Sequence, residues 1–336
     1  MMVSLGKDMG VRAYLYDAGG HDREIGLEDI DIHAVSNDAL LWIDLEGDEA
    51  GAKARVAGAL SLQSPVAVWD GDRERTPVAN HGDFLCFRIV LPAYNEPGAA
   101  SVAGGLASAD ILFAIGKNWV LTSHSGPATL LKEFQENDDA ETLIGALSTA
   151  SFVAALVDRH LGLYFEAASR ISEEVEALDE RVLRDKANKT LLGRIVMLRR
   201  KCARLRALLV ANRSALYALA RPDCMLIIDS GAGEQYFSLT TRFERALDEI
   251  ERARDLVNGS FDLFASRSGL QTNNLVKALT IVTAVFGYFG AVAGLLGMNL
   301  RSTIFNGGDG TFALVVGTLT ITSAIAIFVA RVRKWI

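Results

Sequence analysis

Acidic side chains that could attract a metal cation, followed by small or weakly polar residues, recur at helical spacing in the last third of the sequence, and we call this series the stripe. Steps of three or four residues place all of its members on one face of an α-helix, which has about 3.6 residues per turn. The members are Glu244, Asp248, Glu251, Asp255, Asn258, Asp262, Ser266, Gly269, Asn273, Val276, Thr280, Thr283, Gly287, Gly290 and Gly294. Carboxylates in the first half can concentrate cations, and small residues in the second half leave room beside the helix.

Each half of the stripe also has a simpler explanation. The acidic half alone is typical of a solvated helix face that nearby arginines neutralise in part, and these are Arg242, Arg245, Arg252 and Arg254. The glycines alone are typical of close helix packing in a membrane. Because the two halves share one face, copies arranged around a symmetry axis would form an acidic funnel that opens onto a narrow pore. This hypothesis therefore requires a ring of several chains.

Asn299 follows the stripe and carries a hard but neutral amide oxygen. Such an oxygen can accept hydrogen bonds from the water around Mg²⁺, an ion that dehydrates reluctantly. In a ring, Asn299 would form a circle of amide oxygens at the pore mouth. Gly294 and Gly297 would permit close backbone approach just inside, and Met298 is expected to pack against neighbouring helices.

Two uncharged segments, residues 278–300 and 311–330, are each close to the roughly 20 residues that a membrane-spanning helix needs. Basic residues flank them at Arg267, at Lys277 and in the tail over 331–336, whereas the loop over 301–310 has one arginine and one aspartate. The positive-inside rule predicts both termini in the cytoplasm and the loop outside the cell (inner) membrane. The first residues lack the apolar core of a secretory signal.

The residues before the spans are predicted to form an α/β domain over 1–139, followed by helices. Hydrophobic alternation and turn residues predict strands at 11–16, 40–45, 84–91, 111–115 and 119–123, helices near 50–60 and 128–137, and a loop at 95–105. A helical hairpin is expected over 140–221, with a break near 184–189. A stalk helix is expected from Glu234 through residue 277 and on to Leu296.

Two further patterns predict how the helices pack. The first arm of the hairpin is acidic and the second is basic, which predicts ion pairs between them; the residues are Glu173, Glu174, Glu176, Asp179 and Glu180, and Arg194, Arg199, Arg200, Lys201, Arg204 and Arg206. A second series on the stalk helix is apolar and is expected to pack against protein. It comprises Phe243, Leu247, Ile250, Val257, Phe261 and Phe264.

Composition and spacing argue against several other functions. The net charge of −7 argues against a nucleic-acid partner. Cys86, Cys202 and Cys224 lie far apart with no histidine nearby, so the sequence encodes no local zinc site. Asp158 and His160 are a neighbouring acid and imidazole without a nucleophile, and they fit an ordinary helix surface. We therefore expect neither an enzyme nor a bound cofactor.

The order of motifs at the C-terminus resembles the CorA superfamily of divalent cation channels and transporters. Gly297-Met298-Asn299 ends the first span, and a short loop, a second span and a basic tail follow. The segments NNLVKALTIVTAVF, WIDLEG and WVLTSH, which begin at Asn273, Trp42 and Trp119, are also similar to that family.

The resemblance implies a homopentamer with a cytoplasmic funnel and long pore-lining helices. It implies that Asn299 binds the hydrated ion at the entrance and that Asp262 faces the cytoplasmic continuation of the pore. The pore-lining residues would be Gly290, Gly287, Leu279, Val276 and Asn273. The basic collar around the inner exit would be Arg331, Arg333 and Lys334.

We therefore expect CorA-type transport of divalent metal cations into the cytoplasm, with Mg²⁺ as the default and Co²⁺, Ni²⁺ or Zn²⁺ as alternatives. The expected partners are further copies of the chain, the lipid bilayer and the cation itself, which is substrate and possible regulator at sites that the sequence does not locate. The glycines of GLLG and of the loop favour the ZntB branch, a proton-coupled zinc importer. A second alternative is a membrane-anchored sensor or scaffold that conducts nothing. Arg301 beside the entrance opposes cation entry unless Asp309 offsets it.

Overall fold

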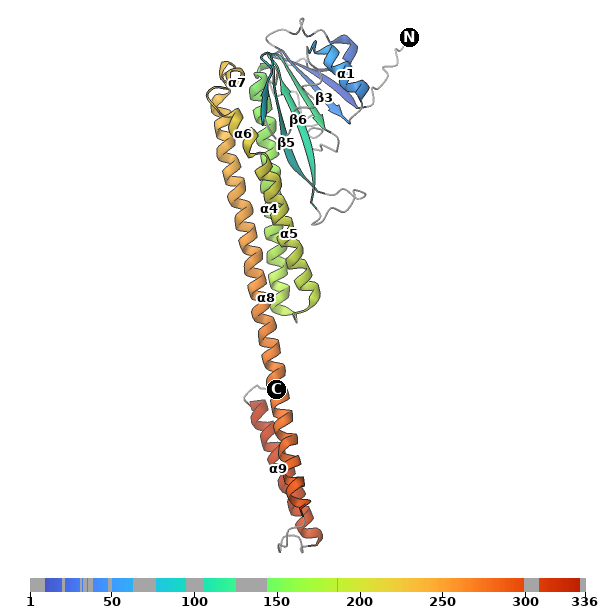
Figure 1. Cartoon of the computed structure of the whole chain (residues 1–336), viewed down its shortest axis with the longest axis vertical. Coiled ribbons are helices and arrows are strands. Elements are labelled where there is room, and N and C mark those ends of the chain that lie inside the picture. The colour runs from blue at the N-terminus through green and yellow to red at the C-terminus, as the bar shows by residue number, and fades with distance from the viewer. Residues whose placement is uncertain are drawn as a thin grey trace. The chain divides into compact units, whose positions relative to one another are not determined.

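The computed structural model describes residues 10–19, 22–30, 32, 35, 39–47, 50–62, 77–94, 106–124, 144–185, 187–298 and 308–332 (Figure 1). Its contacts divide the chain into two compact units. The first unit combines Met1–Glu176 with Arg194–Asn258, and the second combines Ala177–Gly193 with Gly259–Ile336.

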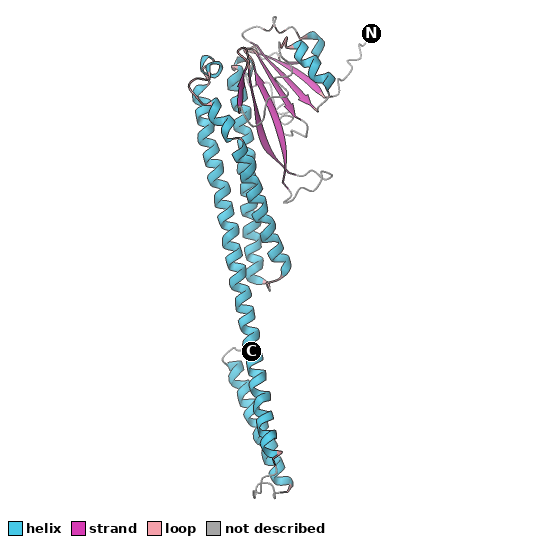
Figure 2. Ribbon diagram, in the orientation of Figure 1, coloured by secondary structure: helices cyan, strands magenta, loops and turns pink. Residues whose placement is uncertain are grey.

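A seven-stranded sheet forms the amino-terminal part of the first unit (Figure 2). The strands are β1 (Val11–Asp17), β2 (Arg23–Ile25), β3 (Ala39–Glu46), β4 (Val78–Asn80), β5 (Leu85–Tyr94), β6 (Leu106–Ile115) and β7 (Trp119–His124), in the spatial order β2-β1-β3-β7-β6-β5-β4. Among the strands that the structure describes, only the pairing of β3 with β7 is parallel, and it sets Asp44 opposite Thr122. The described residues thus contain an α/β domain, as predicted.

The interior strand β3 is buried on both faces, which explains its nearly continuous apolar sequence. On one face Leu41 and Ile43 belong to a core with Val56 of α1 (Ala50–Ala59). On the other face Trp42 meets Phe152 edge-on, with 5.4 Å between ring centroids. The first unit also contains short 3₁₀ turns at Leu27–Asp29 and Ile144–Ala146.

Helices form the rest of the described chain. They are α4 (Thr149–Arg184), α5 (Lys189–Ala211), α6 (Arg213–Leu219), α7 (Met225–Asp229), α8 (Gly233–Leu296) and α9 (Asp309–Val332). The stalk helix α8 is continuous over 64 residues and contains no proline, whose ring would break the hydrogen-bond ladder. The predicted hairpin break lies between α4 and α5.

In the described part of the chain, two helices are long and apolar enough to cross a membrane. The apolar windows in α8 and α9 are 0% and 6% buried within the chain, so they are not core helices of a folded domain. In the second unit, Arg267 of α8 donates through Nη2 to the Leu183 carbonyl in the last turn of α4, at 3.0 Å. A cation at this helix end also opposes the negative end of the helix dipole.

Several detailed expectations differ from the structure. Strands β2 and β4 were not predicted, because each has three residues and no apolar alternation. The predicted helix near 128–137 and loop at 95–105 lie outside the described residues. The apolar series is buried at Phe243, Ile250 and Val257, whereas Phe261 is 46% exposed in the single chain, so the predicted packing of Phe261 against protein stays a prediction.

Ion pairs between the hairpin arms are fewer than the sequence predicted. Lys201 bonds Glu174 at 2.8 Å, and it is the single pair between the two arms in the described part of the chain. Arg204 instead reaches the Ser108 hydroxyl, and Arg206 reaches Glu251 on α8. The basic arm therefore contacts the sheet and the stalk helix as well as the acidic arm. The domain boundaries drawn from the sequence remain a prediction.

Candidate functional site

The stripe follows the uncovered face of α8 over its whole length. Its members are exposed except Glu244 and Glu251, which are half-buried. On the other side of the amino-terminal half of α8, a run of residues is buried against the protein: Phe243, Ala246, Ile250, Ala253 and Val257. The single chain thus packs one side of the helix and leaves most of the stripe exposed.

The same division holds in the apolar half of α8, which lies beside α9 (Figure 1). Residues that are half-buried recur at helical spacing and are Ala278, Ile281, Val285, Phe289 and Val292. With about 100° of rotation per residue, their mean direction is about 180° from that of the stripe members between Val276 and Gly294. The stripe therefore points away from α9.

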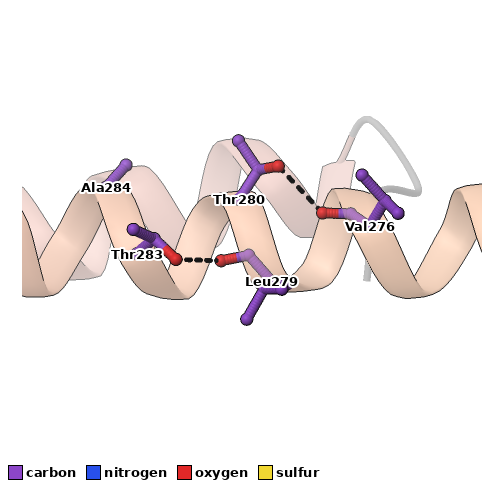
Figure 3. Close-up of a pocket in the computed structure, with 5 residues that line it drawn as sticks. All are labelled: Val276, Leu279, Thr280, Thr283 and Ala284. Carbon is purple, nitrogen blue, oxygen red and sulfur yellow. Dashed lines mark hydrogen bonds between the residues drawn. The ribbon is translucent and has the colours of Figure 1, made fainter.

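An open hollow lies on the stripe face near the amino-terminal end of the apolar segment of α8 (Figure 3). Its lining residues are Val276, Leu279, Thr280, Thr283 and Ala284. The Thr280 hydroxyl donates to the Val276 carbonyl and the Thr283 hydroxyl to the Leu279 carbonyl, each at 2.8 Å. These bonds satisfy the hydroxyl hydrogens without a partner outside the helix.

The acidic members of the stripe differ in their partners. Glu244 accepts from the Tyr217 hydroxyl at 2.5 Å and lies 3.6 Å from Arg213 of α6. This hydrogen bond from the phenol to the carboxylate raises the pKa of Tyr217. Glu251 pairs with Arg206 of α5 at 3.4 Å. Nearby helices thus offset part of the negative charge.

Of the arginines that were expected to neutralise the acidic half of the stripe, one contacts a member of the stripe and two pair with other residues. Arg254 contacts Asp255 at 3.1 Å, whereas Arg242 pairs with Asp158 and Arg252 with Glu249. Within the described residues, Asp248 and Asp262 have no cation within salt-bridge distance. The sequence did not predict the contacts of Arg206, Arg213 and Tyr217 with the stripe. The partners lie far apart along the chain, so they form no local sequence pattern.

The predicted entrance is described only in part. Gly297 and Met298 continue the last turn of α8, where the Gly297 amide donates to the Ala293 carbonyl at 2.9 Å. Met298 is 53% exposed in the single chain. Asn299 and Arg301 lie outside the described residues, as do Arg333 and Lys334 of the predicted collar. Arg331 is exposed in the last turn of α9.

A family model described as CorA-like Mg²⁺ transporter protein matches residues 37–332. The chain belongs to the CorA family. Its curated relatives include two proteins named cobalt/magnesium transport protein CorA. The one from Methanocaldococcus jannaschii is 23% identical over 88% of this chain and 92% of its own length. The one from Thermotoga maritima is 26% identical over 55% of this chain, a match that spans about half (51%) of that relative.

Solved structures of this family share the fold. The complete CorA magnesium transporter from Methanocaldococcus jannaschii aligns with a TM-score of 0.75 at 18% identity, covering 96% of this chain and 98% of that one. The cytoplasmic domain of ZntB from Vibrio parahaemolyticus aligns with a TM-score of 0.57 at 13% identity, covering 77% and 98%. At sequence identities this low, the similarity shows only that the fold is shared.

Two segments that resemble the CorA family contribute to the sheet core. The Thr122 hydroxyl donates to Asp44 at 2.6 Å and accepts from Trp42 Nε1 at 3.0 Å. His124 Nε2 lies 3.4 Å from the same carboxylate, and all three polar side chains are buried. WIDLEG and WVLTSH thus hold the parallel strand pair together through a buried polar network.

Other candidate reactive groups of this CorA-family chain are separated from one another. Asp158 pairs with Arg242 at the surface, whereas His160 is buried in the core beside Phe113, so the predicted place of His160 on a helix surface is wrong. Burial lowers the pKa of His160 to about 4 and raises the pKa of Cys202 to about 11. Among the residues that the structure describes, no three His, Cys, Asp or Glu side chains are placed to share a metal ion.

Proposed function

We propose that this chain forms a homopentamer that transports divalent metal cations into the cytoplasm, with α8 lining the pore. The observation that carries the proposal is the direction of the stripe, about 180° away from the face that packs on α9. In a ring of such chains, α8 can face the axis while α9 faces the lipid. All exposed members of the stripe then face the axis of the ring.

The membrane placement rests on charge and exposure. Apolar windows that the chain itself leaves uncovered need lipid or other copies around them. Arg331 lies in the last turn of α9, and Arg267 and Lys277 precede the apolar part of α8, so basic residues gather on one side. We assign that side to the cytoplasm of a cell (inner) membrane by the positive-inside rule, with both termini there.

The chemistry of the pore face suits a cation that keeps its water. From Val276 to Gly294 the stripe carries no charge that could trap a divalent ion. At the proposed entrance, a ring of Asn299 amides would accept hydrogen bonds from the hydration shell. On the cytoplasmic side the acidic members of the stripe would raise the local cation concentration. Mg²⁺ is the default substrate, because the family model and the curated relatives are named for it.

The test is flux into proteoliposomes that contain the purified protein and Mg²⁺- or Zn²⁺-sensitive dyes, with and without an imposed proton gradient. Mg²⁺ entry that is indifferent to the gradient is the expected result. Zn²⁺ entry that the gradient accelerates would instead indicate the proton-coupled ZntB type. A well-folded protein that admits no divalent cation would contradict the proposal and favour the scaffold alternative, as would a dimer instead of a pentamer in detergent.

A further inference from the structure

The turn of the α4–α5 hairpin concentrates positive charge, and we call residues 181–190 the tip. The acidic part of the first arm ends at Glu180, just before the tip. Within the tip, cations outnumber acids four to one, and the charged residues are Arg181, Arg184, Asp185, Lys186 and Lys189. The hairpin therefore presents a cationic end, although its first arm is acidic as a whole.

Cations of the tip are open to solvent. The Arg184 side chain is 78% exposed, although its Nε lies 3.5 Å from the Asp185 carboxylate. Lys189, at the start of α5, is also exposed. The turn itself is ordered by Asn188, whose Oδ1 accepts from the Leu191 amide at 2.9 Å. Because the single acid can offset one charge at most, the tip keeps a net positive charge that faces outward.

The position of the tip along α8 is fixed within the second unit. That unit joins Ala177–Gly193 to the part of α8 that begins at Gly259. Helix α4 runs toward the apolar part of α8, and α5 returns (Figure 1). Arg267 Nη2 donates to the Leu183 carbonyl at 3.0 Å, which places the tip level with Arg267. The hairpin thus ends shortly before the uncharged segment of α8 begins.

The remaining distance brings the tip close to a membrane surface. Ala278 starts the uncharged segment. It follows Arg267 by 278 − 267 = 11 residues, or about 16 Å at roughly 1.5 Å per residue. Polar headgroups add roughly 5 to 8 Å to each side of the hydrocarbon core. The gap of about 10 Å that is left is similar to the screening length of about 8 Å at physiological ionic strength. Long basic side chains shorten it further.

The protein offers the tip only like charges on this side. Between Arg267 and Ala278, the one charged residue of α8 is Lys277. The last turn of α9 carries Arg331. These cations repel the tip, so its complement on the membrane side is an anionic surface. Anionic lipid headgroups of a cytoplasmic leaflet supply such a surface and attract basic segments within a screening length.

We propose that the tip docks on anionic lipid headgroups of the cytoplasmic leaflet. The inference rests on the membrane placement in the proposed function, and it does not depend on which ion is conducted. The competing partner is an acidic residue on α8 of a neighbouring copy, such as the exposed Asp262. Asp262 precedes Arg267 on α8 and therefore lies on the far side of it from the apolar segment.

The first test identifies what touches the tip. The full-length protein without Cys86, Cys202 and Cys224 carries Thr190→Cys, modified with a long-arm photoactivatable reagent, in nanodiscs of equal parts phosphatidylglycerol and phosphatidylcholine. Mass spectrometry of the adducts should show a preference for phosphatidylglycerol on the order of five-fold. The preference should vanish near 1 M salt, where the screening length is about 3 Å. Equal adducts of both lipids, or adducts to a neighbouring copy alone, would overturn the inference.

The second test uses matched pairs of substitutions in the same assay. Arg184→Gln with Lys189→Gln should reduce the preference nearly to the composition of the disc. Arg199→Gln with Arg200→Gln removes equal charge from α5, at least ten residues or about 15 Å beyond Lys189, and should keep it. Equal losses in both pairs would overturn the inference.

A probe on α9 separates failure of the inference from failure of the membrane placement. Phe328 is 67% exposed in the apolar part of α9. The same reagent at Phe328→Cys should give adducts of both lipids. Adducts there without a lipid preference at the tip would overturn the docking alone. Absence of lipid adducts at Phe328→Cys would reject the membrane placement, and the inference with it.

Discussion

The Asn212 side chain binds both backbone groups of Val90. Its Oδ1 accepts from the Val90 amide at 2.7 Å, and its Nδ2 donates to the Val90 carbonyl at 2.9 Å. The short strand β4 pairs only with Leu85–Phe87 of β5, so Val90 lies beyond it on that side. Asn212 thus continues the missing strand pairing and ties the sheet to the junction of α5 and α6.

Asn212→Ala should destabilise the first unit by about 2 kcal/mol, because it leaves the Val90 amide without its acceptor and opens a buried space. Tyr164→Phe is the matched control. Its hydroxyl also donates to the Val90 carbonyl, at 2.7 Å, but its loss leaves the Asn212 contact in place. It should cost about 1 kcal/mol. Thermal unfolding followed by circular dichroism measures both, and an unchanged midpoint in Asn212→Ala would contradict the role of this contact.

His160 should make stability depend on pH. Burial lowers its folded pKa to about 4 from an ordinary value of 6.5, so the unfolded chain binds the extra proton between these values. Stability is then fully present above pH 6.5 and is lost as pH falls toward 4, by on the order of 3 kcal/mol. In His160→Leu, the unfolding midpoints measured at pH 7.5 and at pH 5 should lie closer together than they do in the parent protein.

The exposed His81 provides the control for this pH dependence. His81→Gln should keep the full difference between the two pH values. If His160→Leu retains the same pH dependence as the parent protein, the buried imidazole is not its source.

Arg206 should restrain the acidic funnel through its pair with Glu251. In Arg206→Gln the freed carboxylate makes the potential more negative, and we expect about two-fold faster divalent cation flux at low ionic strength. The gain should vanish near 1 M salt, where the screening length is about 3 Å. Arg199→Gln removes an exposed charge from the same helix and should have little effect; an equal gain there would point to net charge instead of this contact.

Asn299→Ala should lower flux by at least about ten-fold, because the entrance loses its ring of acceptors for the hydrated ion. Asn306→Ala makes the same change in the loop and serves as the control. Size-exclusion chromatography with light scattering checks that the variant still assembles. Normal flux through an assembled Asn299→Ala protein would reject the role proposed for this residue.

The sequence predicted the helices better than their contacts. The stalk helix was expected from Glu234 to Leu296 and is observed from Gly233 to Leu296, because its period is unbroken and it lacks proline. Periodicity also located the free face of that helix. It could not show that Arg206 and Arg213 contact the acidic half, since such pairs depend on how separate helices pack.

Cysteine accessibility tests the central claim, that the stripe lines the ion pathway. In a protein without Cys86, Cys202 and Cys224, single cysteines replace Thr280 or Gly290 on the stripe and Val285 on the face toward α9. A charged, water-soluble thiol reagent should block flux at both stripe positions and leave the Val285→Cys protein active. Block at Val285→Cys, with stripe cysteines that react but leave flux unchanged, would contradict the account.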